Sequence, residues 1–568
     1  MTEHRSPIPA RVYNAAVGGH VCGPEDVDFG QKVVHLIKYD RAGNEVSFES
    51  QVTQANKIYV IHDDFTLSSN VTIPANCTLQ FEGGSISGAY TLTGNNTGIK
   101  AGLIKIFNTN ITLAGTWNVA EAYPEWFGAK GDGVADDTNA INCCTSSNST
   151  ILSICFIIGK IYKTTEPIII KNNSIIECIN NGRERQSSNV AYIRNYSNNN
   201  IIEFESDNVN SVVIRNLNIR KNDSFGYTGN GIDAEKINSI LGCSFENLDI
   251  EACNIGFNVS FKAYGGYMYN QLNNVRLCWN NYGLVINGQD EFIGTPSYIN
   301  ENEFNRCQFD DNKIGGVKIY NTNTIEQNQF SSCTFQRNGG SISVKQDAYG
   351  VYLVTSTTGT ALFNNCYFEG NHVSVYDEGD ETSSFINADI VVRICHIVCV
   401  GCTFNITRLP IAVLGEETFD ITMISCTSRD TLNYKYDIVF RDFIASSNIL
   451  NSYICYINTP YKALGTYNCT GSFSLDFIPR RNISKNNNFD NTTGTHEVVG
   501  EVKFITLSNG LNMPLSMTTE ELQAAISTYN KWYIPVGICI FNNDTGKPYW
   551  YKRAGSSFSW VDATGTSL

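Results

Sequence analysis

Residues 304–309 read Phe-Asn-Arg-Cys-Gln-Phe, residues 330–335 read Phe-Ser-Ser-Cys-Thr-Phe, and residues 363–368 read Phe-Asn-Asn-Cys-Tyr-Phe. Each segment is apolar at its first, fourth and sixth places, and asparagine follows at the ninth place. Four further segments between residues 211 and 428 repeat the apolar pattern, although two of them have Cys253 or Thr407 at the ninth place. Successive segments are 26 to 36 residues apart, so the middle of the chain is a repeat.

The repeat predicts a solenoid built from β-strands. Periods of 20 to 50 residues are typical of solenoids, propellers and arrays. The fourth to sixth places alternate between apolar and polar residues, which is strand periodicity. The ninth-place asparagine is expected to bend the chain, because asparagine tolerates left-handed backbone angles. A propeller blade needs more residues, and a leucine-rich repeat has its own consensus with helical segments. We therefore predict an all-β fold, a parallel β-helix in which like residues stack on like.

Charge and hydropathy exclude several classes of partner. The chain has 568 residues and a formal net charge of −15. Nucleic-acid-binding surfaces are basic, so nucleic acid is not expected as a partner. An acidic polysaccharide fits poorly for the same reason, unless basic residues cluster. The first residues lack the apolar run of a secretory signal, and no stretch of 18 residues is apolar. We expect synthesis in the cytoplasm without a signal peptide, and no membrane insertion.

The 19 cysteines are interpreted as small buried side chains of a reduced core, because four of them occupy the in-facing fourth place. Cys395, His396, Cys399 and Cys402 have metal-binding side chains. Strand alternation, however, directs Cys395 and Cys399 to one side and the other two to the opposite side. We expect no metal and no cofactor.

Residues 126–141 read Trp-Phe-Gly-Ala-Lys-Gly-Asp-Gly-Val-Ala-Asp-Asp-Thr-Asn-Ala-Ile. This segment resembles the opening motif of the pectate-lyase-like tailspike and tail-fibre proteins of bacteriophages. The resemblance implies a right-handed β-helix over about residues 121–430, a homotrimer, and a place in the virion tail. The glycines permit tight turns. Asp136 or Asp137 is expected to cap a short helix from Thr138 that covers the open end of the solenoid, so Asp132, Asp136 and Asp137 are interpreted as architectural.

Five regions are predicted. Residues 1–53 resemble short virion-anchoring segments of tail fibres, which dock to other tail proteins. Residues 54–120 form a small β domain or early coils that lead into the helix, which spans residues 121–430. An irregular β region and linker follow over residues 431–498. Residues 499–568 resemble the small aromatic modules that end many phage fibres, with a short helix, a hairpin and a third strand.

Candidate catalytic residues lie in the column that follows the sixth place. Asp310 and Glu369 stand there two coils apart, roughly 9 to 10 Å between backbones. An inverting glycosidase separates its two carboxyl groups by about 6.5 to 9.5 Å. Asp311 is the neighbouring third acid, and Arg337 is placed to hold a charged sugar or to lower a neighbour's pKa. The remaining candidates for substrate binding are Glu251, Trp279 and Tyr367.

These observations favour a tailspike or tail-fibre protein that binds bacterial capsular polysaccharide and depolymerises it during host attachment. The enzyme would be a glycoside hydrolase or a polysaccharide lyase. A lyase needs a base such as Tyr, His or Lys and a group that neutralises the substrate carboxylate, and no residue stands out for that role. The alternative is a non-catalytic receptor-binding or structural fibre with the same fold.

Overall fold

The computed structural model describes residues 32–146, 153–178, 190–288, 297–373, 385–406, 409–414, 420–428 and 438–441, with short segments between 453 and 567. The chain divides into two compact units, residues 1–163 with 174–179, and residues 164–173 with 180–568. Residues 1–31 of the predicted anchor and most of the predicted linker at 431–498 lie outside the described residues. The five predicted regions stay predictions. None of the helices in the described part of the chain has the length and hydropathy needed to cross a bilayer.

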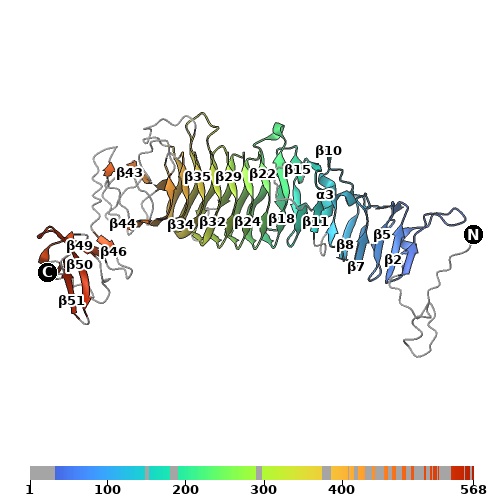
Figure 1. Ribbon diagram of the computed structural model, residues 1–568. Helices are drawn as coiled ribbons and strands as arrows, with labels where there is room; N and C mark the ends of the chain where they lie inside the picture. The colour runs from blue at the N-terminus through green and yellow to red at the C-terminus, as the bar shows by residue number, and fades with distance from the viewer. Residues whose placement is uncertain are drawn as a thin grey trace, which may run out of the picture. The chain divides into compact units, whose positions relative to one another are not determined.

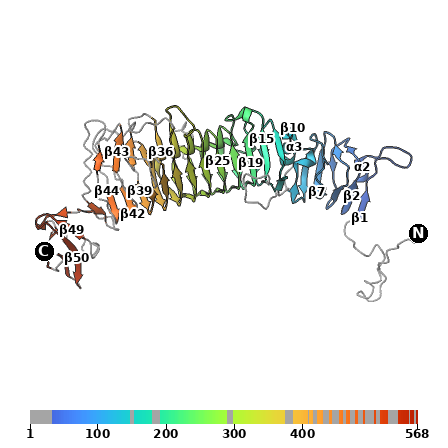
Figure 2. The same cartoon turned by 45° about the horizontal axis from the view of Figure 1, so that its top comes forward.

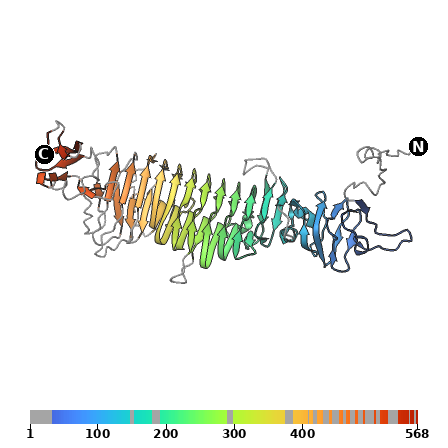
Figure 3. The same ribbon diagram turned by 90° about the horizontal axis from the view of Figure 1, so that it is seen from below.

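The second unit is a right-handed parallel β-helix, as the repeat and the resemblance predicted. Consecutive coils stack side by side along the unit, and their strands run in the same direction (Figures 1 and 3). One sheet collects the fourth-to-sixth-place strand of every coil. Its strands in this unit are β15 (Ala191–Asn195), β19 (Leu217–Lys221), β22 (Asp249–Glu251), β25 (Arg276–Cys278), β29 (Gln308–Asp310), β33 (Thr334–Gln336), β35 (Tyr367–Glu369), β37 (Thr403–Asn405) and β40 (Thr427–Ser428).

Each first-place residue lies on a separate strand that precedes this sheet. A left-handed residue at the third place, such as Asn274 with φ 57°, turns the chain between the two strands. All first-, fourth- and sixth-place residues of the seven segments are at most 2% exposed. Phenylalanines stack between coils, for example Phe304 on Phe330 with ring centroids 4.4 Å apart. The first-place strands are β18 (Val213–Arg215), β21 (Ser244–Glu246), β24 (Gln271–Asn273), β28 (Glu303–Asn305), β32 (Asn328–Ser331), β34 (Ala348–Asn364) and β36 (Asn387–Val400).

The ninth-place asparagine plays a different part from the one predicted. The left-handed residue is the one before it, as at Asp311 (φ 57°) and Arg337 (φ 52°). Asn312 and Asn338 are fully buried, and the Nδ2 of Asn312 donates to the Oδ1 of Asn338 at 3.0 Å. The same Nδ2 donates to the backbone oxygen of Leu277 in the preceding coil at 3.0 Å. The asparagines therefore form a buried ladder, and the chain bends one residue earlier.

The cysteines of the repeat are free and buried, as predicted. The Sγ of each fourth-place cysteine donates to a backbone oxygen of the preceding coil, for example Cys333 to Phe304 at 3.1 Å. Cys402 faces the core instead of sharing a side with His396, which is half-buried and pairs with Asp420 at 2.5 Å. Among the described residues, no three His, Cys, Asp or Glu side chains are arranged to hold a metal ion.

The first unit also consists of parallel strands, which fits early coils better than a separate β domain. β1 (Lys32–His35), β2 (Lys57–Ile61), β5 (Thr78–Phe81) and β7 (Thr91–Lys100) pair in that order (Figure 2). The Asp137 carboxylate accepts from the backbone nitrogens of Lys130 and Gly131 at 2.7 and 3.0 Å, and Asp136 caps α3 (Thr138–Ser146) through Thr138. These acids are architectural, as expected. The helix does not cover an open end, because parallel strands precede it in the same unit.

The C-terminal sheet confirms the predicted hairpin and third strand. β49 (Cys539–Asn542), β50 (Lys547–Ala554) and β51 (Ser557–Val561) pair antiparallel, and β48 (Ser516–Met517) lies parallel to β49. Tyr551 and Trp560 are each 1% exposed and contact each other, so these aromatic rings form the core of the sheet.

We expect Asn338→Leu to destabilise the coils around it by about 2–4 kcal/mol, because it leaves the buried Nδ2 of Asn312 and the backbone oxygen of Phe309 without partners from residue 338. Asn305→Leu is the control, because it removes a hydrogen bond of similar length, 3.1 Å to Asn273, on the outer face. This variant should change the free energy of unfolding by less than about 0.5 kcal/mol. Hydrogen exchange over residues 304–371 measures both. Equal effects of the two variants would contradict the ladder's role.

Candidate functional site

The predicted acid column exists. Asp310 on β29 pairs in register with Gln336 on β33, and Gln336 pairs with Glu369 on β35. Asp310 and Glu369 therefore face outward from the same sheet, two strands apart, with the Gln336 side chain between them. At the strand spacing of about 4.8 Å, their backbones are roughly 9 to 10 Å apart.

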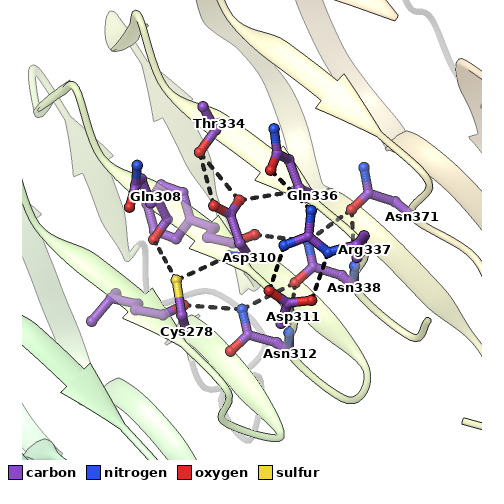
Figure 4. A network of polar contacts seen from close by, with 12 residues as sticks. Cys278, Gln308, Asp310, Asp311, Asn312, Thr334, Gln336, Arg337, Asn338 and Asn371 are labelled. Atoms are coloured by element: carbon purple, nitrogen blue, oxygen red, sulfur yellow. Dashed lines mark hydrogen bonds and ion pairs between the residues drawn. The ribbon is translucent and has the colours of Figure 1, made fainter. Parts of the chain in front are cut away.

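Asp310 is only 9% exposed, although an exposed position was expected. Figure 4 shows its carboxylate next to Thr334 and Gln336. Its carboxylate leans toward the next coil, where both oxygens accept from the Thr334 hydroxyl at 3.1 Å and Oδ1 accepts from the Gln336 backbone nitrogen at 3.0 Å. Burial raises the pKa of Asp310 to about 6, against the lowering effect of these hydrogen bonds and of Arg337. A carboxyl group with this pKa holds a proton in part of the molecules near neutral pH, as a general acid must.

Asp311 and Arg337 form an ion pair on the corner next to this column. The Arg337 Nε and Nη2 donate to the two carboxylate oxygens of Asp311 at 2.8 and 2.6 Å, and the arginine side chain is 52% exposed. This pairing raises the pKa of Arg337. Two guanidinium nitrogens of Arg337 bond the Asp311 carboxylate, so Asp311 holds the arginine side chain beside Asp310. Asp311 is therefore a poor candidate for a third catalytic acid.

Glu369 and Tyr367 are joined through one amide. The Asn405 Nδ2 donates to the Tyr367 hydroxyl at 2.7 Å and to a Glu369 oxygen at 3.3 Å. Both Glu369 and Tyr367 are half-buried on the outer face of β35. The Glu369 carboxylate thus has a fixed direction and still meets solvent, which a general base for water requires.

Glu251 and Trp279 are less suitable than predicted. Glu251 is 9% exposed and accepts from Arg220 at 3.1 Å, so it is engaged in an ion pair. Trp279 is 41% exposed, but the Arg276 guanidinium lies 4.1 Å from its ring centroid and covers one face. The structure brings Asp310, Asp311, Arg337 and Glu369 together and leaves Glu251 out.

A groove that the sequence did not predict lies on another face of the helix. A cavity of about 640 Å³ lies along the outer face of β24, β28 and β32, and its lining includes Tyr269, Glu301, Glu303, Gln327 and Gln329. The place before each first place supplies five of the lining residues in register: Gln271, Glu303, Gln329, Leu362 and Val398. The polar residues Gln271, Glu303 and Gln329 each precede an apolar first place and are a signal for this face in the sequence, whereas the predicted site lies in the column after the sixth place.

Comparison with known proteins shows likeness in fold. No family model and no curated protein matches the sequence. A tailspike of an Acinetobacter phage is 11% identical over 80% of this chain and 82% of its own, with a TM-score of 0.44. Tailspike protein 3 of bacteriophage CBA120 is 12% identical over 79% and 70%, with a TM-score of 0.34. The A-module of a mannuronan C-5 epimerase from Azotobacter vinelandii is 12% identical over 65% and 99%, with a TM-score of 0.32. Likeness at this level concerns the solenoid alone.

The raised pKa of Asp310 should make the free energy of unfolding fall as the pH rises. Its folded-state pKa of about 6 lies above the ordinary 3.8, so the stability from its protonated form is complete below about pH 4 and lost as the pH rises through about 6. Between about pH 4 and 6, the free energy of unfolding of the wild type should fall by up to about 3 kcal/mol relative to that of Asp310→Asn. Denaturant unfolding of both proteins at several pH values measures the difference. A difference that is constant with pH would contradict the raised pKa.

Proposed function

We propose that this chain is a tailspike or tail-fibre protein that binds bacterial surface polysaccharide and hydrolyses it with Asp310 and Glu369. The observation that carries the proposal is the buried Asp310 carboxyl, with its pKa raised to about 6, in register with a more exposed carboxylate two strands away. Two carboxyl groups whose environments differ in this way are suited to the separate roles of acid and base.

In the proposed reaction, protonated Asp310 donates its proton to the glycosidic oxygen of the leaving sugar. Glu369 accepts a proton from a water molecule, which attacks the anomeric carbon from the opposite side, and the C–O bond breaks. A spacing of two strands leaves room for that water, so the reaction would invert the anomeric configuration. Arg337 and Tyr367 line the same face and would position the sugar, while Asp311 orients Arg337.

The place of the protein in a virion tail rests on the segment at 126–141 and on the solenoid fold. A homotrimer would cover solenoid faces that a monomer leaves in water. The N-terminal segment would then dock to other tail proteins. The alternative function, polysaccharide binding without cleavage, is favoured by the groove, which has the size of a ligand site and lies away from Asp310.

Digestion of purified bacterial surface polysaccharides tests the proposal. Asp310→Asn and Glu369→Gln should each slow depolymerisation at least about 100-fold. The wild-type rate should decline above about pH 6 as Asp310 loses its proton. Product size by gel filtration gives the rate, and nuclear magnetic resonance of the first products gives the anomeric configuration.

Glu246→Gln is the matched control, because Glu246 is also half-buried on the outer face, on β21, and should leave the rate unchanged. Products that absorb ultraviolet light as unsaturated sugars would indicate a lyase and refute the acid and base roles. Binding with no shortening of any polysaccharide would support the non-catalytic alternative.

A further inference from the structure

The groove lies where the cross-section of the helix changes. In the coils up to β32, a second corner separates β27 (Tyr298–Asn300) from β28 and β31 (Thr324–Glu326) from β32. In the next two coils, β34 and β36 run without interruption through the corresponding position. Gly359 allows this straight strand to approach the preceding coil closely, because a Cβ there would lie 2.3 Å from the Ile325 backbone oxygen. The corner column therefore stops at Gln327, and the lining continues on the straight strands with Thr360, Leu362 and Val398.

A second buried asparagine ladder fixes the corner side of the groove. The Nδ2 of Asn270 donates to the Oδ1 of Asn302 at 3.2 Å, and the Nδ2 of Asn302 donates to the Oδ1 of Asn328 at 2.8 Å. The residue before each of these asparagines is left-handed and exposed. These residues are Tyr269, Glu301 and Gln327, with φ of 58°, 55° and 54°.

The lining has the chemistry that recognises sugar rings. Tyr269 is 58% exposed and offers an aromatic face for the apolar side of a pyranose. Gln271, Glu303 and Gln329 follow one another on adjacent strands, so three successive coils each carry a planar group that can bond two neighbouring hydroxyls. Leu362 and Val398 continue the column on the next two coils. A column of this kind suits an extended chain of sugars that runs parallel to the helix axis.

The charge of the groove restricts the sugar. Glu301 and Glu303 are both exposed, and Glu326 is exposed on the strand that leads to Gln327. Among the lining side chains that the structure describes, none is Lys, Arg or His. A polyanion would meet carboxylates without a neutralising cation.

We propose that this groove is a binding site for an uncharged polysaccharide, separate from the Asp310 face. This proposal rests on the proposed function in one respect, namely that the ligand is a polysaccharide. Tyr269 stacks on a sugar ring, while Gln271, Glu303 and Gln329 bond the hydroxyls of successive residues. The groove holds the polymer on β24, β28 and β32, while the acids act from β29 and β35.

Native affinity gel electrophoresis tests the groove. Gels contain either a neutral polymer (dextran, mannan or hydroxyethylcellulose) or an acidic one (alginate, polygalacturonate or hyaluronan). The protein carries Asp310→Asn, which slows any cleavage of the ligand, so the two proposals fail separately. At least one neutral polymer should retard this protein and no acidic one should. Adding Tyr269→Ala should weaken binding about tenfold.

Tyr39→Ala is the matched control, because Tyr39 is also 58% exposed but lies in the first unit and should leave binding unchanged. Gln271→Ala with Gln329→Ala should weaken binding further without changing the melting temperature, since both side chains are outside the core. Retardation by acidic polymers, no retardation by any neutral polymer, or retardation that Tyr269→Ala leaves unchanged would each overturn the proposal.

Discussion

The hydrogen bonds of the buried asparagines are the constraint on which the second unit depends. The amide of Asn312 is fully buried, and its donors and acceptor find partners only in the coil before and the coil after. An unsatisfied buried amide costs about 1–3 kcal/mol, so each coil requires a similar residue at the same place in the next. The series ends at Asn371, whose Nδ2 donates to the buried Asp389 at 2.7 Å. A carboxylate suits this end of the ladder because it accepts a hydrogen bond and, unlike an amide, has no N–H group that needs an acceptor in a further coil.

The ladders also determine where variable side chains can stand. The residue before each ladder asparagine has positive φ and points away from the core, as at Trp279, Asp311 and Arg337 on one corner and Tyr269, Glu301 and Gln327 on the other. Such backbone angles cost about 1–3 kcal/mol for residues other than glycine and persist when the surroundings impose them. Here the ladder imposes them. The buried columns repeat from coil to coil, whereas the outward columns differ from coil to coil and are free to carry chemistry.

The sequence predicted the core well and the surface only in part. The apolar first, fourth and sixth places predicted the solenoid, because like residues must stack to bury the same surface in every coil. The column of Asp310 and Glu369 followed from the same register. The burial of Asp310 did not, since it depends on Thr334 and on a backbone nitrogen of the next coil. The residue type predicts the bend at Asn338, because asparagine favours left-handed angles. The bend lies at Arg337 instead, because the buried Asn338 amide hydrogen-bonds to Phe309 and Asn371. The groove depends on where a corner ends between β32 and β34, and spacing alone does not indicate that.

The most direct test of the account is a crystal structure of the Asp310→Asn protein with oligosaccharides from a polysaccharide that the wild type shortens. The account predicts a glycosidic oxygen within hydrogen-bonding distance of the residue 310 side chain, and a water molecule between the sugar and Glu369. Sugar density confined to other surfaces, with none along β29, β33 and β35, would contradict it.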